Sequence, residues 1–214
     1  MTSIPASARA VAVVASSVPG EFLVPDLVDV FVTDQPEFTV DTTLTDSEGV
    51  FSALRDGRAE VGFAGVEPDD TDLVATPVDA DELVLAVPAG HELAGADTAS
   101  VASLASTPMV EREEGSGTRR SFVDALAERG TPLFAQDWAV RDSNEGVLDA
   151  VAQGAGVGVL SSWVLERHPR DDVRTVRVEG DPIRRRLFLV LRADAELGPA
   201  ASTFVDLVRS RARG

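Results

Sequence analysis

The chain has 214 residues, of which 44% are hydrophobic and 26% charged, a balance typical of a folded globular protein rather than a disordered one. Its formal net charge is −17 at pH 7 and all 19 basic residues are arginine, so the acidic surface disfavours binding of this chain itself to DNA or to an anionic membrane. Cysteine is absent, which excludes disulfides, thiol catalysis and thiolate metal sites.

We interpret the acidity and the replacement of lysine by arginine as the composition of a salt-adapted organism with a GC-rich genome. The start of the chain lacks the basic residues and the apolar segment of a signal peptide. The longest apolar runs fall far short of the roughly 20 residues that a membrane span needs. These features predict a soluble, cytoplasmic protein.

The first part of the chain alternates between predicted strands and helices. A continuous apolar run suits a strand buried on both faces, and apolar residues at i, i+3, i+4 and i+7 indicate a helix. A second helix is expected to begin at an N-cap formed by Asp46 or Ser47 and to end at Gly57. The patterns predict strands over 10–15, 37–44 and 60–65 and helices over 24–31 and 47–54.

The second part repeats this rhythm after two short predicted strands over 73–78 and 82–88, and we expect the chain to cross between two subdomains near 83–87. Helices are predicted over 119–128, after Ser143, after Ser161 and along a final stripe at 204–211. Strands are predicted over 108–112, 137–140 and 157–160, and over 173–178 and 185–192, the last two returning to the first subdomain. Alternating β–α units of this kind predict the α/β class with open parallel sheets.

The most informative segment is Gly115-Ser116-Gly117-Thr118-Arg119, where a predicted strand runs into a helix. Such a junction directs backbone N–H groups and two hydroxyls at one small volume, which suits an anion or a carboxylate. The segment lacks the lysine of a Walker A loop and the glycine spacing of a dinucleotide fingerprint. It therefore predicts a ligand-binding cleft rather than a catalytic centre, and Arg119 is a candidate partner for an anion.

Other hydroxyl-rich loops also follow predicted strands, where open α/β sheets bind ligands. They contain Ser16, Ser17, Ser47, Asn144 and Ser161. The alternative for each loop is that its side chain caps the helix that follows.

No residue pattern indicates an enzyme, a metal site or a cofactor. His91 and His168 have no spaced partner that would make a metal site or a Ser-His-Asp arrangement. Neighbouring acidic residues such as Asp171 and Asp172 point apart, so they do not form a catalytic pair.

The order and spacing of several segments resemble those of a known family. The segments are Ala15-Ser16-Ser17 with 20–25, Ala53–Gly57 before Glu60-Val61-Gly62, Glu82–Pro88 with Gly90-His91, Arg112–Arg119, and Val151-Ala152 with Gly154–Leu160. Together they resemble the effector-binding domain of LysR-type transcriptional regulators, which is itself similar to type 2 periplasmic binding proteins. The resemblance covers nearly the whole chain from about Arg9.

The resemblance implies two Rossmann-like subdomains joined by two hinge crossings, with a small-molecule effector between them. Subdomain I would comprise 9–84 and 187–214, subdomain II 85–186, and residues 1–8 would be a leader or linker remnant. The ligand-binding residues it implies are Ser16, Ser17, Ser47, Ser116, Gly117, Thr118, Asn144 and Ser161, to which the loop pattern adds Gly115 and Arg119.

The resemblance also implies a homodimer or tetramer. DNA would be bound only through a helix-turn-helix domain, for which the few residues before the first predicted strand leave no room. The chain would then be either a fragment or a stand-alone binding domain. Two alternatives remain: a solute-binding protein that serves a transporter, and an enzyme on the same fold, such as an acyl-group dehydratase or a phosphoribosyl transferase.

Overall fold

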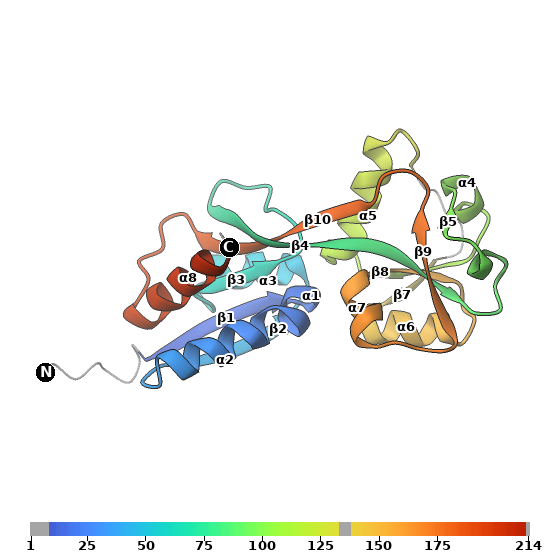
Figure 1. Ribbon diagram of the computed structural model, residues 1–214. Coiled ribbons are helices and arrows are strands. Elements are labelled where there is room, and N and C mark those ends of the chain that lie inside the picture. The colour runs from blue at the N-terminus through green and yellow to red at the C-terminus, as the bar shows by residue number, and fades with distance from the viewer. Residues whose placement is uncertain (1–8, 133–137, 213–214) are drawn as a thin grey trace, which may run out of the picture. The chain divides into compact units, whose positions relative to one another are not determined.

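Strands and helices alternate along the chain and build a mixed α/β fold, which confirms the predicted class. The computed structural model describes residues 9–132 and 138–212. The chain divides into two units. Unit 1 comprises Met1–Ala80 and Arg186–Gly214, as far as these are described, and unit 2 comprises Asp81–Arg185. The strands β4 (Leu73–Pro88) and β10 (Ile183–Arg192) each contribute residues to both units (Figure 1).

The sheet of unit 1 contains the strand order β2-β1-β3-β10, with β1 parallel to both β2 and β3 and β10 antiparallel to β3. Its other elements are β1 (Ala10–Ser16), α1 (Ser17–Phe22), α2 (Val24–Asp34), β2 (Thr39–Thr45), α3 (Ser47–Arg55), β3 (Val61–Ala64) and α8 (Pro199–Arg211). Because successive side chains of a strand point to opposite faces, Val13 packs with residues of α2 and α8 while Val14 packs with residues of α3.

The sheet of unit 2 contains the order β4-β8-β6-β7, with β6 parallel to both β7 and β8 and β8 antiparallel to β4. Its other elements are η2 (Glu92–Gly95), β5 (Thr98–Ala99), α4 (Val101–Leu104), β6 (Met109–Arg112), α5 (Gly117–Glu128), β7 (Trp138–Arg141), α6 (Asn144–Ala152), β8 (Val157–Ser161), α7 (Ser162–Arg167) and β9 (Val173–Val178). Along the part of the chain that the structure describes, no helix combines the length and apolar character that crossing a membrane requires.

In each unit, a helix packs closely against a glycine of the neighbouring strand. A Cβ added at Gly62 of β3 would lie 2.7 Å from Leu54 Cδ1 of α3, and one added at Gly158 of β8 would lie 2.7 Å from Val147 Cγ1 of α6. Both distances are too short for real carbon contacts, so the helices approach their strands this closely only because the side chain is missing.

The structure corrects three predictions about the elements. The segments 73–78 and 82–88 form one strand, β4, because Asp81 between them is buried and paired with Arg185 of β10 instead of forming a turn. β9 does not return to unit 1: it pairs with β4 at Leu85–Pro88, and its Val176 and Val178 lie in the core of unit 2. The helix expected to start at Arg119 starts at Gly117.

Four short elements, α1, η2, β5 and α4, were not predicted, because segments of two to six residues carry too little periodicity. The predicted strand 137–140 begins at Asp137, which lies outside the described residues, and its described part belongs to β7.

Candidate ligand-binding site

In unit 2, the candidate site lies where β6, β7 and β8 end. β6 and β7 run parallel, with Arg112 opposite Arg141, so the loops that follow them leave from the same edge of the sheet. The loop after β6 opens α5 and the loop after β7 opens α6. This is the edge at which parallel α/β sheets bind ligands.

The Gly115–Thr118 segment leads into the first turn of α5. Ser116 occupies the N-cap position in an extended conformation, yet its side chain makes no capping hydrogen bond. Ser116 and Thr118 are 3% and 4% exposed. The first turn of α5 contains no acidic residue, so the partial positive charge of the helix start is not offset within that turn.

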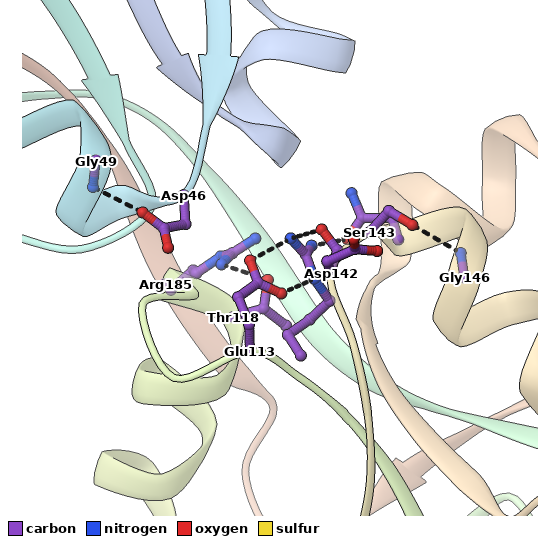
Figure 2. Close-up of polar contacts among 10 residues, drawn as sticks. Asp46, Gly49, Glu113, Thr118, Asp142, Ser143, Gly146 and Arg185 are labelled. Carbon is purple, nitrogen blue, oxygen red and sulfur yellow. Dashed lines mark hydrogen bonds and ion pairs between the residues drawn. The ribbon is translucent and has the colours of Figure 1, made fainter. Parts of the chain in front are cut away.

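Of the predicted ligand contacts, Asn144 lies beside a helix cap and Ser161 is itself one. Ser143 Oγ accepts a hydrogen bond from Gly146 N at 3.1 Å and thereby caps α6, the helix that Asn144 begins (Figure 2). Ser161 Oγ accepts one from Trp163 N at 3.2 Å and caps α7. For Ser161, the capping alternative considered from the sequence is thus realised.

A buried arginine that the sequence reasoning missed holds the two loops of unit 2 together. The side chain of Arg112 is 2% exposed. It donates to both carboxylate oxygens of Glu113 at 2.8 and 2.7 Å, to Asn144 Oδ1 at 2.7 Å and to the carbonyl oxygen of Asp142 at 3.2 Å. In Figure 2, Glu113 and Asp142, which carry three of these acceptor oxygens, lie on the loops after β6 and β7. Arg112 therefore fixes the position of Asn144 relative to the loop that opens α5.

Arg119, the predicted partner for an anion, pairs with a carboxylate of the protein. Its Nε lies 3.0 Å from Glu111 Oε2. Burial raises the pKa of the Glu111 carboxyl above its ordinary value, while the positive charge of Arg119 acts in the opposite direction. The positive charge of Arg119 is thus partly neutralised within unit 2.

In unit 1, three predicted residues lie at the carboxyl ends of two parallel strands. Ser16 ends β1 opposite Thr45 of β2, Ser17 begins α1 and Ser47 begins α3. Asp46 caps α3 by accepting a hydrogen bond from Gly49 N at 2.7 Å (Figure 2). Ser47 is 1% exposed, and its Oγ has no hydrogen-bond partner in the part of the chain that the structure describes. A buried hydroxyl left unpaired by its own protein is suited to bind a ligand or a water molecule.

The structure thus gathers the predicted residues into two sets, one in each unit. The described residues contain no cluster of three or more histidine or acidic side chains suited to holding a metal ion. Sequence reasoning found the hydroxyls through the loops that follow strands, but it missed Arg112, Asp81 and Arg185, each of which has a partner far away in sequence.

Two α/β units linked by two strands, with polar loops at the carboxyl ends of their parallel strands, define the class of effector-binding α/β domains. Within that class, the chain belongs to the LysR substrate-binding domain family, whose model matches residues 6–213.

The chain is also similar to curated relatives and to solved structures. The chain is 38% identical over 201 residues to the phosphonates import ATP-binding protein PhnC of Anaeromyxobacter dehalogenans, and the match covers 92% of this chain and 40% of that protein. It is 34% identical to an uncharacterised HTH-type transcriptional regulator of Methanocaldococcus jannaschii, covering 91% of this chain and 66% of the regulator. The chain therefore spans less than two thirds of the length of both relatives.

Among solved structures, the effector binding domain of QuiR in complex with shikimate superposes with a TM-score of 0.86 at 16% identity. The match covers 95% of this chain and 97% of that domain. At this identity the likeness concerns the fold.

Proposed function

We propose that this chain is the effector-sensing domain of a LysR-type transcriptional regulator that responds to a small anionic molecule. The observation that carries the proposal is that, at the starts of both α3 and α5, a buried hydroxyl is left unused by the helix cap. Ser47 Oγ has no partner among the described residues and the Ser116 side chain makes no capping bond. Hydroxyls and helix N-termini together favour a carboxylate or another oxyanion.

The proposed ligand contacts come from both units. They are Ser16, Ser17, Ser47, Gly115, Ser116, Gly117, Thr118, Arg119, Asn144 and Ser161. A ligand that binds residues of both units favours the arrangement of the units in which all contacts are made. In a complete regulator, this preference would change how the DNA-binding domains are presented to the promoter. Because promoters are the target of such a regulator, we assign its action to the cytoplasm.

The test is a thermal-shift screen in high KCl with shikimate, sulfate, phosphate and small mono- and dicarboxylates, followed by calorimetry on each molecule that stabilises the protein. We expect saturable binding of one molecule per chain. Thr118→Val is expected to weaken binding by about 1–3 kcal/mol because a ligand oxygen loses its donor.

Thr175→Val provides a matched control, because Thr175 is exposed on β9 of the same unit. It should leave the affinity unchanged. A panel without any saturable shift would contradict the proposed function, and an unchanged affinity in Thr118→Val would remove Thr118 from the site.

We further propose that the chain self-associates as a dimer or tetramer through unit 1. β2 lies at the end of the strand order, and Leu44 on it is 54% exposed. Val32 on the neighbouring helix α2 is 37% exposed. An open strand edge with exposed apolar side chains is suited to association. Sedimentation that shows only monomer at tens of micromolar would contradict this part of the proposal.

A further inference from the structure

An ion pair is buried where the chain enters and leaves unit 2. Asp81 on β4 and Arg185 on β10 are the first and last residues of that unit. Their side chains are 0% and 5% exposed. Arg185 Nε donates to Asp81 Oδ1 and Arg185 Nη2 donates to Asp81 Oδ2, both at 2.7 Å. This two-point contact fixes the plane of the guanidinium group.

The third side of the same guanidinium contacts the proposed ligand loop. Arg185 Nη1 donates a hydrogen bond to Thr118 Oγ1 at 3.0 Å, and Figure 2 shows this bond at the start of α5. Guanidinium nitrogens donate only, so the threonine oxygen is the acceptor. The single hydroxyl proton of Thr118 then points away from Arg185 and remains for donation to another group.

The charge of Arg185 is already neutralised by Asp81. Burying two charges costs free energy that is recovered only while the pair stays intact, so Arg185 is held in place and does not turn toward an anion. Its effect on a ligand therefore passes through the hydroxyl of Thr118.

A second guanidinium acts on the same site in the same way. Arg112 Nη1 donates to Asn144 Oδ1 at 2.7 Å, which occupies the acceptor end of the Asn144 amide. Both arginines thus occupy oxygens of predicted ligand contacts.

From these contacts we propose that Arg185, held by Asp81, is a positioning residue that directs the Thr118 hydroxyl proton away from itself, polarises the hydroxyl toward donation and so favours a ligand with an acceptor oxygen at that point. The inference rests on the proposed function and extends it to the ligand chemistry. A carboxylate offers an acceptor oxygen to this hydroxyl in either orientation. The matching carboxamide offers only its carbonyl oxygen, and in the other orientation its NH₂ group meets a hydroxyl polarised toward donation.

The first experiment tests the contact without any ligand. The chain contains no cysteine, so Thr118→Cys introduces a single thiol beside Arg185. We measure the pH at which the rate of alkylation by iodoacetamide reaches half of its maximum. We expect this pH to be lower in Thr118→Cys alone than in Thr118→Cys combined with Asp81→Leu/Arg185→Met, because a guanidinium stabilises the thiolate. The double substitution removes both buried charges together, so it leaves no unpaired charge that would unfold the chain.

A neighbouring ion pair gives the matched control. Arg177 Nε lies 2.7 Å from Glu82 Oε1, joins β9 to β4, and has a side chain that is 62% exposed. Thr118→Cys with Glu82→Leu/Arg177→Met should titrate as in the native background. Equal reactivity profiles with and without the Asp81–Arg185 pair would overturn the inference.

The second experiment tests selectivity, with shikimate and its primary carboxamide as the probe pair. We expect the preference for the carboxylate to fall about tenfold in Asp81→Leu/Arg185→Met and to stay unchanged in Glu82→Leu/Arg177→Met. In the Thr118→Val background, the charge-pair substitution should have no further effect, because its influence passes through the hydroxyl.

The outcomes separate the two proposals. If Thr118→Val weakens binding but the charge-pair substitution leaves the selectivity unchanged, the inference is wrong and the proposed function stands. If no molecule of the panel binds, the proposed function fails, and the thiol experiment alone decides whether Arg185 positions residue 118.

Discussion

Glu111 is 5% exposed at the end region of β6, and burial raises the pKa of its carboxyl group although Arg119 pairs with it. The native state therefore holds this proton more tightly than the unfolded chain does. Its contribution to the free energy of unfolding is complete below the ordinary pKa of a glutamate and is lost as the pH rises through the raised pKa. We expect Glu111→Gln, which cannot ionise, to gain stability relative to the wild type as the pH rises from about 4 to about 7.

Urea unfolding at a series of pH values measures this difference. Comparing the two proteins at each pH cancels the contributions of the exposed pairs, such as that of Asp172, whose pKa is lowered by its hydrogen bond to Arg170. Parallel stability curves for wild type and variant would contradict the role assigned to burial of Glu111.

The candidate site could be predicted only in part because its residues depend on contacts of different range. Ser47 and the Gly115–Thr118 segment follow strands directly, so local sequence indicates them. Asp81 and Arg185 are 104 residues apart, and nothing in either local sequence indicates that they meet. Arg119 carries the expected charge, but its pairing with Glu111 depends on side-chain packing that a linear pattern does not contain.

Close packing of a helix on a glycine occurs in both units and gives a prediction at the level of elements. In unit 2, a Cβ at position 158 would lie 2.7 Å from Val147 and 2.8 Å from Val151, so β8 and α6 would have to separate. We expect Gly158→Ala to lower the free energy of unfolding by about 1–3 kcal/mol, as overpacked cores do.

Urea denaturation followed by circular dichroism measures this loss. Gly95→Ala is the control: Gly95 is exposed and a Cβ there meets nothing within 4 Å, so its effect should stay within about 0.5 kcal/mol. Equal stabilities of the two variants would show that α6 can move without cost.

The elements that were predicted correctly are those with a strong local pattern. β1 is a continuous apolar run, and α3 and α6 carry both a capping residue and apolar residues at helical spacing. β4 and β9 were misread because strand pairing, not local pattern, determines them. The polar residues around Asp81 look like a turn until the partner on β10 is known.

At the scale of the whole molecule, the chain contains 36 acidic residues and 19 arginines, which gives the net charge of −17. Like charges on one surface repel each other and destabilise the compact state, and salt screens this repulsion. We expect the melting temperature to rise steeply between about 0.05 M and about 0.5 M KCl, and further toward molar KCl. Sucrose at matched osmolality is the control, and it should reproduce little of the rise in melting temperature seen at the lower KCl concentrations. A melting temperature independent of KCl would contradict salt adaptation.

Unit 2 is one continuous stretch of chain inserted between the two parts of unit 1. A ribosome therefore completes the unit with the Gly115–Thr118 loop before it makes α8, whose Phe204 is fully buried against Phe31 at a ring distance of 5.1 Å. Until α8 emerges, the apolar faces of β1 and α2 lack their cover. Since domains fold as units during synthesis, the inserted unit can mature first, while the unit begun earlier is finished last.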